Sequence, residues 1–206
     1  MQIFFKQNLA ILAVPKTGTT AYAMALRSEA DIIFTKRRKH MTAGQFHNKT
    51  APFLERLYRL KPERLAVMRE PIDQIRSWYR YRSQLRLEGR PASTAGCSFD
   101  DFVLAVISDS PPEFAKIGSQ YRFLIQRDGS LAVHHLFAYE KQPLLRKFLE
   151  DRFEKPLTVN TRNASPPVDA QLSPEVESRL RKARPDEFRL YNQLMDKGGY
   201  LFQESV

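Results

Sequence analysis

A strand-length apolar run that ends in a short polar turn and continues at once into helix-forming residues constrains the fold of this chain most strongly. Residues 9–14 (LAILAV) form the run, residues 15–20 (PKTGTT) the turn, and residues 21–28 (AYAMALRS) the helical segment. The backbone N–H groups at the start of such a helix face a common point, where the helix dipole favours negative charge. The turn adds one ammonium group and three hydroxyls, so the pattern predicts a site for a phosphate-like anion.

This turn is close to the loop that binds nucleoside triphosphates, but it differs from that loop at two positions. The triphosphate loop reads GxxxxGK followed by Ser or Thr, and its last two residues contact the β/γ-phosphates and Mg²⁺. With Gly18 aligned, Ala13 stands in place of the first glycine and Thr19 in place of the lysine. The cation stands earlier, at Lys16. The turn is therefore poorly suited to Mg·ATP and better suited to a phosphate that carries a less charged transferable group.

A second strand, turn and helix follow later in the chain. Residues 65–68 (LAVM) form a short apolar run, and Pro71 stands where the first turn of a helix tolerates proline. Arg69 then lies at the carboxyl end of the predicted strand, and Ser77 lies two turns into the predicted helix, where serine is otherwise slightly unfavourable. A guanidinium fork and a hydroxyl in these positions predict a site for a second phosphate beside the first.

Together, PKTGTT after a first strand and RxPxxxxxSxY (residues 69–79) after a later one resemble the two motifs with which sulfotransferases bind 3′-phosphoadenosine-5′-phosphosulfate (PAPS). The resemblance implies that the 5′-phosphosulfate is bound by Pro15, Lys16, Thr17, Gly18, Thr19 and Thr20. It also implies that Arg69 and Ser77 bind the 3′-phosphate. Weaker similarity to the carbohydrate-type, bacterial branch of that family extends over nearly the whole chain, through residues 39–43, 119–121, 128–129, 136–140, 163–165 and 186–191.

The resemblance implies in-line transfer of a sulfuryl group from PAPS to a hydroxyl, or an amine, of a carbohydrate-like or small-molecule acceptor, with no metal required. Lys16 is the candidate for neutralising the oxygen that bridges sulfur and the leaving phosphate. His40 is the candidate base, because a neutral imidazole suits proton abstraction and this residue follows the second predicted strand, at the edge where α/β sheets bind ligands. Its cationic neighbours Lys36, Arg37 and Lys39 are expected to lower its pKa.

Several weaker candidates and two other functions remain open. His47 is the second candidate for the base, Arg82 and Arg162 are candidates for contacting the cofactor or an acidic acceptor, and Gln120 is a candidate for lining the acceptor cleft. One alternative function is that of a divergent P-loop kinase or NTPase, which magnesium-dependent ATP binding would support. The other is that of a non-catalytic anion-binding protein with the same fold.

Composition and charge limit the partners that the chain is expected to have. The 206 residues are expected to form a single domain, residues 1–206, and part of the net charge of +10 is assigned to the site for the anionic nucleotide. The basic run at residues 36–39 suits an acidic glycan or nucleic acid, but no nucleic-acid-binding module is found, so nucleic acid is not an expected partner. The single cysteine, Cys97, excludes an internal disulfide. With neither a signal peptide nor a membrane span in the sequence, a cytoplasmic protein is expected.

The alternation of apolar runs with helical segments predicts an α/β protein with a three-layer, P-loop-like fold, in which a central parallel sheet of about four to five strands is flanked by helices. The predicted strands cover residues 8–14, 31–35, 64–69 and 132–139, with a weaker one near 156–160. The predicted helices cover residues 18–28, 42–48, 52–60, 71–87, 99–108, 141–152, 173–184 and 186–196. Thr42 with Gln45, and Ser98 with Asp101, have the spacing of helix capping boxes.

Overall fold

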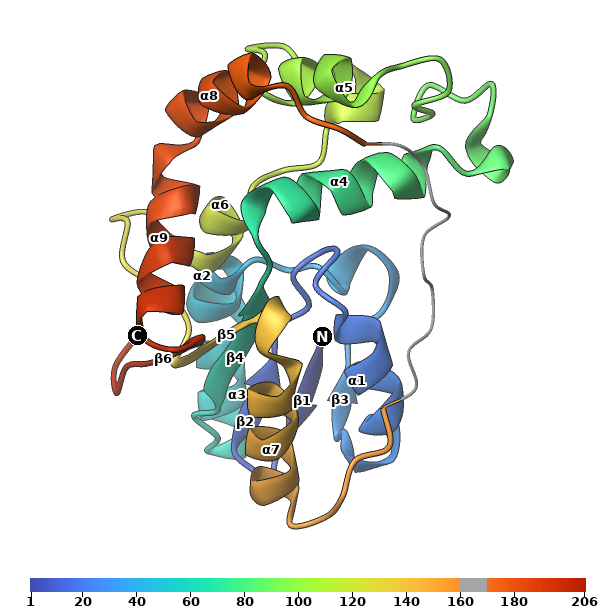
Figure 1. The fold of residues 1–206 in the computed structure, drawn as a ribbon. Coiled ribbons are helices and arrows are strands. Elements are labelled where there is room, and N and C mark those ends of the chain that lie inside the picture. Colours follow the sequence, from blue (N-terminus) through green and yellow to red (C-terminus); the bar gives the residue numbers. More distant parts are fainter. Residues whose placement is uncertain (160–169) are drawn as a thin grey trace.

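The computed structural model describes residues 1–159 and 170–206, and in them the chain forms an open six-stranded sheet flanked by helices (Figure 1). The strands are β1 (Gln2–Phe4), β2 (Leu9–Ile11), β3 (Ile32–Ile33), β4 (Glu63–Met68), β5 (His135–Ala138) and β6 (Tyr200–Phe202). Their order across the sheet is β3-β1-β2-β4-β5-β6. The protein is therefore an α/β protein, as the sequence predicts.

The sheet is mixed rather than wholly parallel. β2 pairs with β4, and β4 with β5, in parallel, whereas β1 is antiparallel to both β2 and β3, and β6 is antiparallel to β5. The four main predicted strands correspond to β2, β3, β4 and β5, which all run in one direction because β2 and β3 are both antiparallel to the β1 between them. The prediction of a parallel sheet is wrong at β1 and β6. In the described chain neither strand leads into a helix, since β1 is followed by β2 and β6 is the last element, so both lack the strand-to-helix turn that marked β2 and β4 in the sequence.

The α-helices of the described residues are α1 (Thr19–Ala25), α2 (Ala43–Gln45), α3 (Ala51–Tyr58), α4 (Pro71–Arg82), α5 (Phe99–Val106), α6 (Gln120–Leu124), α7 (Gln142–Phe153), α8 (Pro174–Ala183) and α9 (Pro185–Asp196). A π-helical turn at residues 46–50 joins α2 to α3, so the predicted helices 42–48 and 52–60 are one continuous helical segment. The predicted helix 71–87 ends at Arg82, and α6 is absent from the prediction. Both predicted capping boxes, Thr42 with Gln45 and Ser98 with Asp101, are confirmed.

The weaker strand predicted near 156–160 is wrong for residues 156–159, which form no strand, and residue 160 lies outside the described residues. Leu157 is buried, and it packs in the same apolar cluster as Leu145, Leu149 and Phe153 of α7. The apolar residues of this segment therefore reflect contact with a helix and its neighbours rather than pairing with a strand.

Alternating residues of β4 bury the two faces of the sheet against different helices. Ala66 and Met68 pack in one cluster with residues of α2, α6 and α9. Leu65 and Val67 pack on the opposite face with residues of α1 and α7. Because both faces are covered, the strand is a continuous apolar run rather than an alternation of apolar and polar residues, which is typical of a central parallel strand.

A separate apolar cluster supports α4 beyond the carboxyl ends of the central strands. The helices α4, α5 and α8 meet around the buried side chains of Tyr79, Phe102 and Leu180. In Figure 1, α4 lies across the upper end of the sheet, with α5 and α8 above it and the turn after β2 below it. One face of α4 is therefore packed in this cluster, and another is directed toward that turn.

Phe102→Ala is expected to lower the free energy of unfolding by about 3–5 kcal/mol, because the ring is 0% exposed and a cavity would replace it. The matched control is Leu85→Ala, at a side chain that is 85% exposed, which should change stability by less than about 0.5 kcal/mol. Chemical denaturation measures both. A loss of less than about 1 kcal/mol for Phe102→Ala would contradict the packing of this cluster.

Candidate functional site

The turn between β2 and α1 presents backbone donors. Lys16 and Gly18 both have positive φ angles, of 68° and 71°, so the chain reverses sharply before the helix. No side chain caps the start of α1, and the first N–H groups of a helix have no partner within it. The Thr17 hydroxyl donates to the Val14 carbonyl at 2.9 Å, and Thr17 is 1% exposed. The hydroxyl proton of Thr17 is therefore used within the turn.

One face of α4 lies over this turn. Gln74 Nε2 donates to the Pro15 carbonyl at 3.3 Å. Lys16 Nζ lies 4.4 Å from the ring centroid of Tyr81 and 5.7 Å from that of Trp78. Positions 74, 78 and 81 share one helix face, because side chains three, four and seven residues apart lie above one another. Ser77, three residues after Gln74, belongs to the same helix face by this spacing, and its part in a phosphate site stays a prediction.

Arg69 joins the end of β4 to the turn. Its Nη1 donates to the Lys16 carbonyl at 3.5 Å, and its guanidinium carbon lies 4.6 Å from the ring centroid of Tyr139. The backbone of Arg69 is held by the Gln120 side chain, whose Oε1 accepts from the Arg69 N–H and whose Nε2 donates to the Arg69 carbonyl, both at 2.9 Å. Gln120 is 1% exposed, so it positions Arg69 and does not line an open acceptor cleft, contrary to the expectation from sequence.

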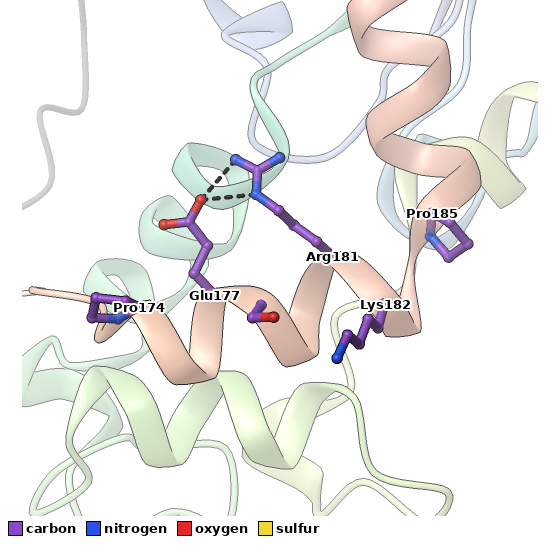
Figure 2. Close-up of a pocket in the computed structure, with 6 residues that line it drawn as sticks. Pro174, Glu177, Arg181, Lys182 and Pro185 are labelled. Atoms are coloured by element: carbon purple, nitrogen blue, oxygen red, sulfur yellow. Dashed lines mark hydrogen bonds and ion pairs between the residues drawn. The ribbon is translucent and has the colours of Figure 1, made fainter.

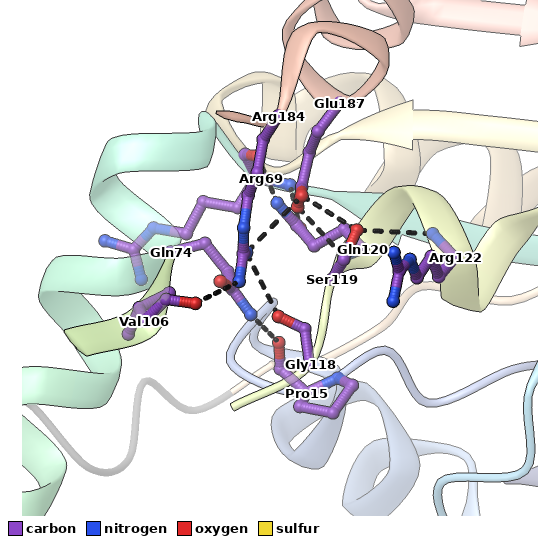
Figure 3. Close-up of polar contacts among 10 residues, drawn as sticks. All are labelled: Pro15, Arg69, Gln74, Val106, Gly118, Ser119, Gln120, Arg122, Arg184 and Glu187. Carbon is purple, nitrogen blue, oxygen red and sulfur yellow. Dashed lines mark hydrogen bonds and ion pairs between the residues drawn. The ribbon is translucent and has the colours of Figure 1, made fainter. Parts of the chain in front are cut away.

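The support of Gln120 comes from α9 (Figure 3). The carboxylate of Glu187, which is 2% exposed, accepts from the Gln120 N–H at 2.9 Å and from the Ser119 hydroxyl at 2.8 Å. Arg184 lies 3.5 Å from the same carboxylate and donates to the Gly118 carbonyl at 3.1 Å. This chain of contacts fixes the segment before α6 and, through Gln120, the end of β4.

Cations gather at the turn, and the described part of the chain places no ion-paired carboxylate beside Lys16. Burial, and to a smaller extent the positive charges of Arg69 and Arg86, lower the pKa of Lys16 to about 8. Among the described residues no carboxylate raises this pKa. The acidic residues at the start of α4 are used locally: Glu70 accepts from the Asp73 N–H at 2.7 Å, and the Asp73 carboxylate pairs with Arg76. The turn is therefore a strongly positive and partly buried region.

Three buried polar atoms around the turn have no hydrogen-bond partner among the described residues. They are Arg69 Nε, Gln74 Oε1 and Trp78 Nε1. Buried polar atoms are normally paired, because an unpaired one costs roughly 1–3 kcal/mol. Two donors and one acceptor are therefore available beside the cationic turn.

His40 lies beside the turn as the sequence predicts. Its Nδ1 is 2.7 Å from the Ala13 carbonyl, so Nδ1 carries the proton and the Nε2 lone pair is free. Burial lowers the pKa of His40 and nearby Lys39 adds to this, while the Ala13 carbonyl opposes it. The predicted direction is confirmed, but burial and not the basic run is the largest cause. Lys39 Nζ donates to the Thr20 hydroxyl at 3.2 Å, which holds this segment against the start of α1.

The structure does not bring the weaker candidates to the turn. His47 lies at the other end of the central strands, near the start of β4, with Nδ1 3.1 Å from Nη1 of Arg64. Arg82 is 9% exposed and donates to the carbonyls of Glu113 and Lys116, so it holds a loop in place. Arg162, and residues 163–165 of the family resemblance, lie outside the described residues.

Two aromatic residues beside the turn, Tyr139 and Tyr81, were not among the site residues predicted from the sequence. Tyr139, directly after β5, packs against Gly18 as well as Arg69, and its place at the carboxyl end of the predicted strand 132–139 is the signal that could have found it. Tyr81 contacts Lys16 and could have been found from its spacing to Ser77. Tyr79 is a core residue whose hydroxyl donates to the Cys97 carbonyl.

A cavity of about 600 Å³ along α8 contains none of the predicted site residues (Figure 2). Two of its three charged side chains are paired, since Arg181 and Glu177 lie 2.7 Å apart, and Lys182 is the third. The Arg181 guanidinium carbon also lies 4.4 Å from the ring centroid of Phe188. This groove therefore lacks the several neighbouring cations that gather at the turn.

Comparisons with models of protein families, with curated proteins and with solved structures found no match. Within residues 1–159 and 170–206, no group of three or more His, Cys, Asp or Glu side chains is arranged to hold a metal ion. In the same two ranges, no helix combines the length and the apolar character needed to cross a membrane. The function must therefore be inferred from the geometry of the turn and its neighbours.

Gly18→Ala is expected to lower the free energy of unfolding by more than Gly129→Ala does. Both glycines have positive φ, which costs about 1–2 kcal/mol for a residue with a Cβ. A Cβ at Gly18 would also lie 2.9 Å from Cε2 of Tyr139, whereas at Gly129 it would meet no atom within 4 Å. Urea denaturation compares the two variants, and equal losses would contradict the close approach of Tyr139 to the turn.

Lys16→Gln is expected to change how the stability of the ligand-free protein depends on pH. The pKa of Lys16 is about 8 in the folded protein, against 10.5 in the unfolded chain. Between these values the unfolded state binds the proton and the folded state does not, so wild-type stability rises with pH. Below pH 8 the full cost of burying the ammonium is present, and the variant lacks this cost. Urea unfolding from pH 7 to above pH 10 should therefore show the free energy of unfolding of the wild type rising relative to that of the variant. The same pH dependence for both proteins would contradict the lowered pKa of Lys16.

Proposed function

We propose that the protein is a sulfotransferase that uses PAPS, built on a three-layer, P-loop-like α/β fold. The observation that carries the proposal is that Lys16, Arg69 and Arg86 gather beside an uncapped helix start, where no carboxylate of the described residues offsets the lowered pKa of Lys16. Cations held together in this way are stabilised by an anionic ligand. A nucleotide with a 5′-phosphosulfate and a 3′-phosphate has an anionic group for each half of the site.

The residues present fit such a nucleotide. The unpartnered Nε of Arg69 and Nε1 of Trp78 are donors, which suits phosphate and sulfate oxygens, and the unpartnered Oε1 of Gln74 is an acceptor for an amino or hydroxyl group. The backbone N–H groups of Thr17, Gly18 and Thr19 would hold the 5′-phosphosulfate, with Pro15 and Thr20 completing the turn. Arg69, whose guanidinium contacts the Lys16 carbonyl, and Ser77, on the face of α4 that also carries Gln74, would hold the 3′-phosphate.

Lys16 would stabilise the charge that develops during transfer. PAPS, when bound, supplies a sulfuryl group already bonded to a phosphate leaving group. The Lys16 ammonium would bind the oxygen that gains negative charge, and a contact that strengthens in the transition state raises the rate. The rings of Trp78 and Tyr81 hold Nζ in place by cation–π contacts. The anion would also raise the pKa of Lys16 and keep it protonated.

His40 would take the proton from a hydroxyl, or an amine, of a carbohydrate-like or small-molecule acceptor. Its Nδ1 is engaged by the Ala13 carbonyl, which leaves Nε2 as the basic atom. Its lowered pKa keeps the imidazole neutral at pH 7, in the form that can accept a proton. A base fixed beside the start of α1 is close to the turn that would hold the transferable group.

Calorimetric binding of 3′-phosphoadenosine-5′-phosphate in EDTA, compared with ATP and Mg²⁺, tests the proposal. The bisphosphate is expected to bind at least tenfold more tightly, about 1.4 kcal/mol. Tighter binding of Mg·ATP, with no bisphosphate signal, would overturn the sulfotransferase assignment and favour a divergent kinase or NTPase. Bisphosphate binding without sulfate transfer to any acceptor would favour a non-catalytic anion-binding protein.

Arg69→Ala is expected to weaken binding of the 3′,5′-bisphosphate by roughly tenfold to a hundredfold, since a charge-assisted hydrogen bond contributes about 1.5–3 kcal/mol. Binding of adenosine 5′-phosphate, which lacks the 3′ group, should change little. Arg56→Ala, at an exposed arginine of α3, is the matched control for loss of positive charge. Equal losses for the two nucleotides would remove Arg69 from the 3′-phosphate site.

His40→Asn is expected to lower kcat by about 10²–10⁴-fold while leaving bisphosphate affinity nearly unchanged. Asparagine can still donate to the Ala13 carbonyl from about the place of Nδ1, but it has no basic atom where Nε2 lies. Single-turnover transfer to an identified acceptor measures the effect. Near-normal turnover of the variant would show that another group is the base.

A further inference from the structure

The helix α3 exposes most of its length to solvent. Of its eight residues, six are exposed and only Leu54 is buried in the core. Three of the exposed side chains are large and hydrophobic: Phe53 is 42% exposed, Leu57 59% and Tyr58 46%. A surface helix normally directs its apolar side chains toward the core, as α3 does with Leu54. The other three are therefore not explained by the packing of this helix on the sheet.

These side chains form a contiguous group with the turn between β1 and β2. The ring centroid of Tyr58 lies 5.0 Å from that of Phe5 and 6.0 Å from that of Phe53. Leu57 is four residues after Phe53, so these two share a helix face. We call Phe5, Phe53, Leu57 and Tyr58 the apolar patch. Single exposed apolar residues are common on protein surfaces, whereas a contiguous group is typical of an interaction surface.

Exposed cations accompany the apolar patch. Arg56 is three residues after Phe53 and shares its helix face. Lys49 precedes α3 in the continuous helical segment, and Arg59 follows the last residue of α3. Lys49, Arg56 and Arg59 are all exposed, and in the described part of the chain none of them forms an ion pair. Their positive charges are therefore available to a partner.

The carboxylates close to this surface are already used. Glu55 lies 2.8 Å from Lys61 Nζ, and Glu154 lies 4.0 Å from Lys6 Nζ, so a lysine balances each of them. Asp31 accepts at 2.7 Å from the first backbone N–H of the turn that follows β1. Within the described residues, five cations thus stand against three carboxylates here, and the surface has an excess of positive charge.

The apolar patch lies at the amino ends of the central strands, away from the candidate site. The chain leaves α3 and enters β4 at Glu63, and the turn after β1 leads into β2 at Leu9. The Glu63 N–H donates to the Asn8 carbonyl at 2.9 Å, so the two strand starts are adjacent. In Figure 1, α3 accordingly lies in the lower half of the molecule, whereas α4 lies across the upper end of the sheet. A partner bound to the patch would leave the candidate site accessible.

The residue types of this surface fit an acidic membrane better than a second copy of the chain. Helices that lie on membranes combine Phe and Leu with Lys and Arg, because the apolar side chains enter the headgroup region and the cations attract acidic lipids. A second copy would bring cations against cations. A stable protein interface also involves roughly 20–30 residues on each side, far more than the patch provides.

We propose that α3 and the turn between β1 and β2 form a membrane-docking surface, in which the apolar patch enters the headgroup region of an acidic lipid bilayer and Lys49, Arg56 and Arg59 contact anionic headgroups. The protein would lie on the membrane with the candidate site directed away from it. The proposal does not depend on the function proposed for the turn between β2 and α1.

Co-sedimentation of the intact protein with lipid vesicles tests the proposal. Vesicles of phosphatidylcholine with phosphatidylserine should bind it at least about tenfold more tightly than phosphatidylcholine alone (about 1.4 kcal/mol). Raising the salt concentration from about 0.1 M to about 0.5 M should weaken this binding severalfold, because salt screens exposed charges. Absence of binding to the acidic vesicles at the lower salt concentration, or equal binding to both kinds of vesicle, would overturn the proposal.

The double variant Phe53→Ser, Leu57→Ser removes apolar contacts without a change of charge. It should weaken binding to the acidic vesicles by about tenfold or more at equal salt. Leu144→Ser is the matched control, at a leucine of α7 that is 43% exposed, and it should change binding by less than about twofold. Circular dichroism and thermal unfolding confirm that the variants fold. A folded double variant with unchanged binding would show that another surface holds the vesicles.

The double variant Lys49→Gln, Arg56→Gln tests the cations. It should weaken binding to the acidic vesicles severalfold and reduce the dependence on salt. The matched control is Arg179→Gln, Lys182→Gln on α8, where both side chains are exposed and form no ion pair within the described residues. Equal losses for the two double variants would show a general effect of net charge and would overturn the docking surface.

Analytical ultracentrifugation of the free protein tests the second copy as the occupant. The proposal expects a sedimentation coefficient that does not change with protein concentration and is the same for wild type and for Phe53→Ser, Leu57→Ser. A dimer of the wild type that this double variant dissociates would show that the patch is an interface between copies of the chain, and would overturn the proposal.

Discussion

The parallel pairing of β2, β4 and β5 is the constraint on which the site depends. Parallel strands have their carboxyl ends on the same side of the sheet, and the residues that follow these three strands meet there. Lys16, Arg69 and Tyr139 are far apart in the sequence, yet the Arg69 guanidinium contacts both the Lys16 carbonyl and the Tyr139 ring. The antiparallel β1 and β6 widen the sheet without contributing to this edge.

Holding cations together opposes folding, so the surrounding contacts must fix them. Gln120 binds the backbone of Arg69 on both sides, and Glu187 fixes Gln120 from α9. The acidic side chains close to the turn serve local contacts, as when Glu70 caps α4, and leave the positive charge unbalanced. Such an arrangement is unfavourable in the free protein and favourable with an anion, which is the physical basis of the function proposed above.

The two ends of β4 are built on the same principle with different supports. Each end has an arginine whose Nε has no hydrogen-bond partner in residues 1–159 and 170–206, Arg64 near the start and Arg69 after the end. Arg64 is held by imidazoles and carbonyls, and Arg69 by an amide and an aromatic ring. Strand alternation directs Glu63 to the opposite face, toward Arg152, so the acid beside Arg64 in the sequence does not neutralise it.

The sequence by itself determined the α/β class, four of the strands, the main helices and the residues of the turn, because apolar period, capping residues and strand-to-helix turns are local signals. It also indicated Arg69 and Ser77 from their places after a strand and within a helix. Only the tertiary structure decided that Gln120 supports Arg69, that Arg82 holds a loop and that His47 lies far from the turn. These outcomes depend on which helices cover which face and edge of the sheet, and that packing joins residues with no local relation in the sequence.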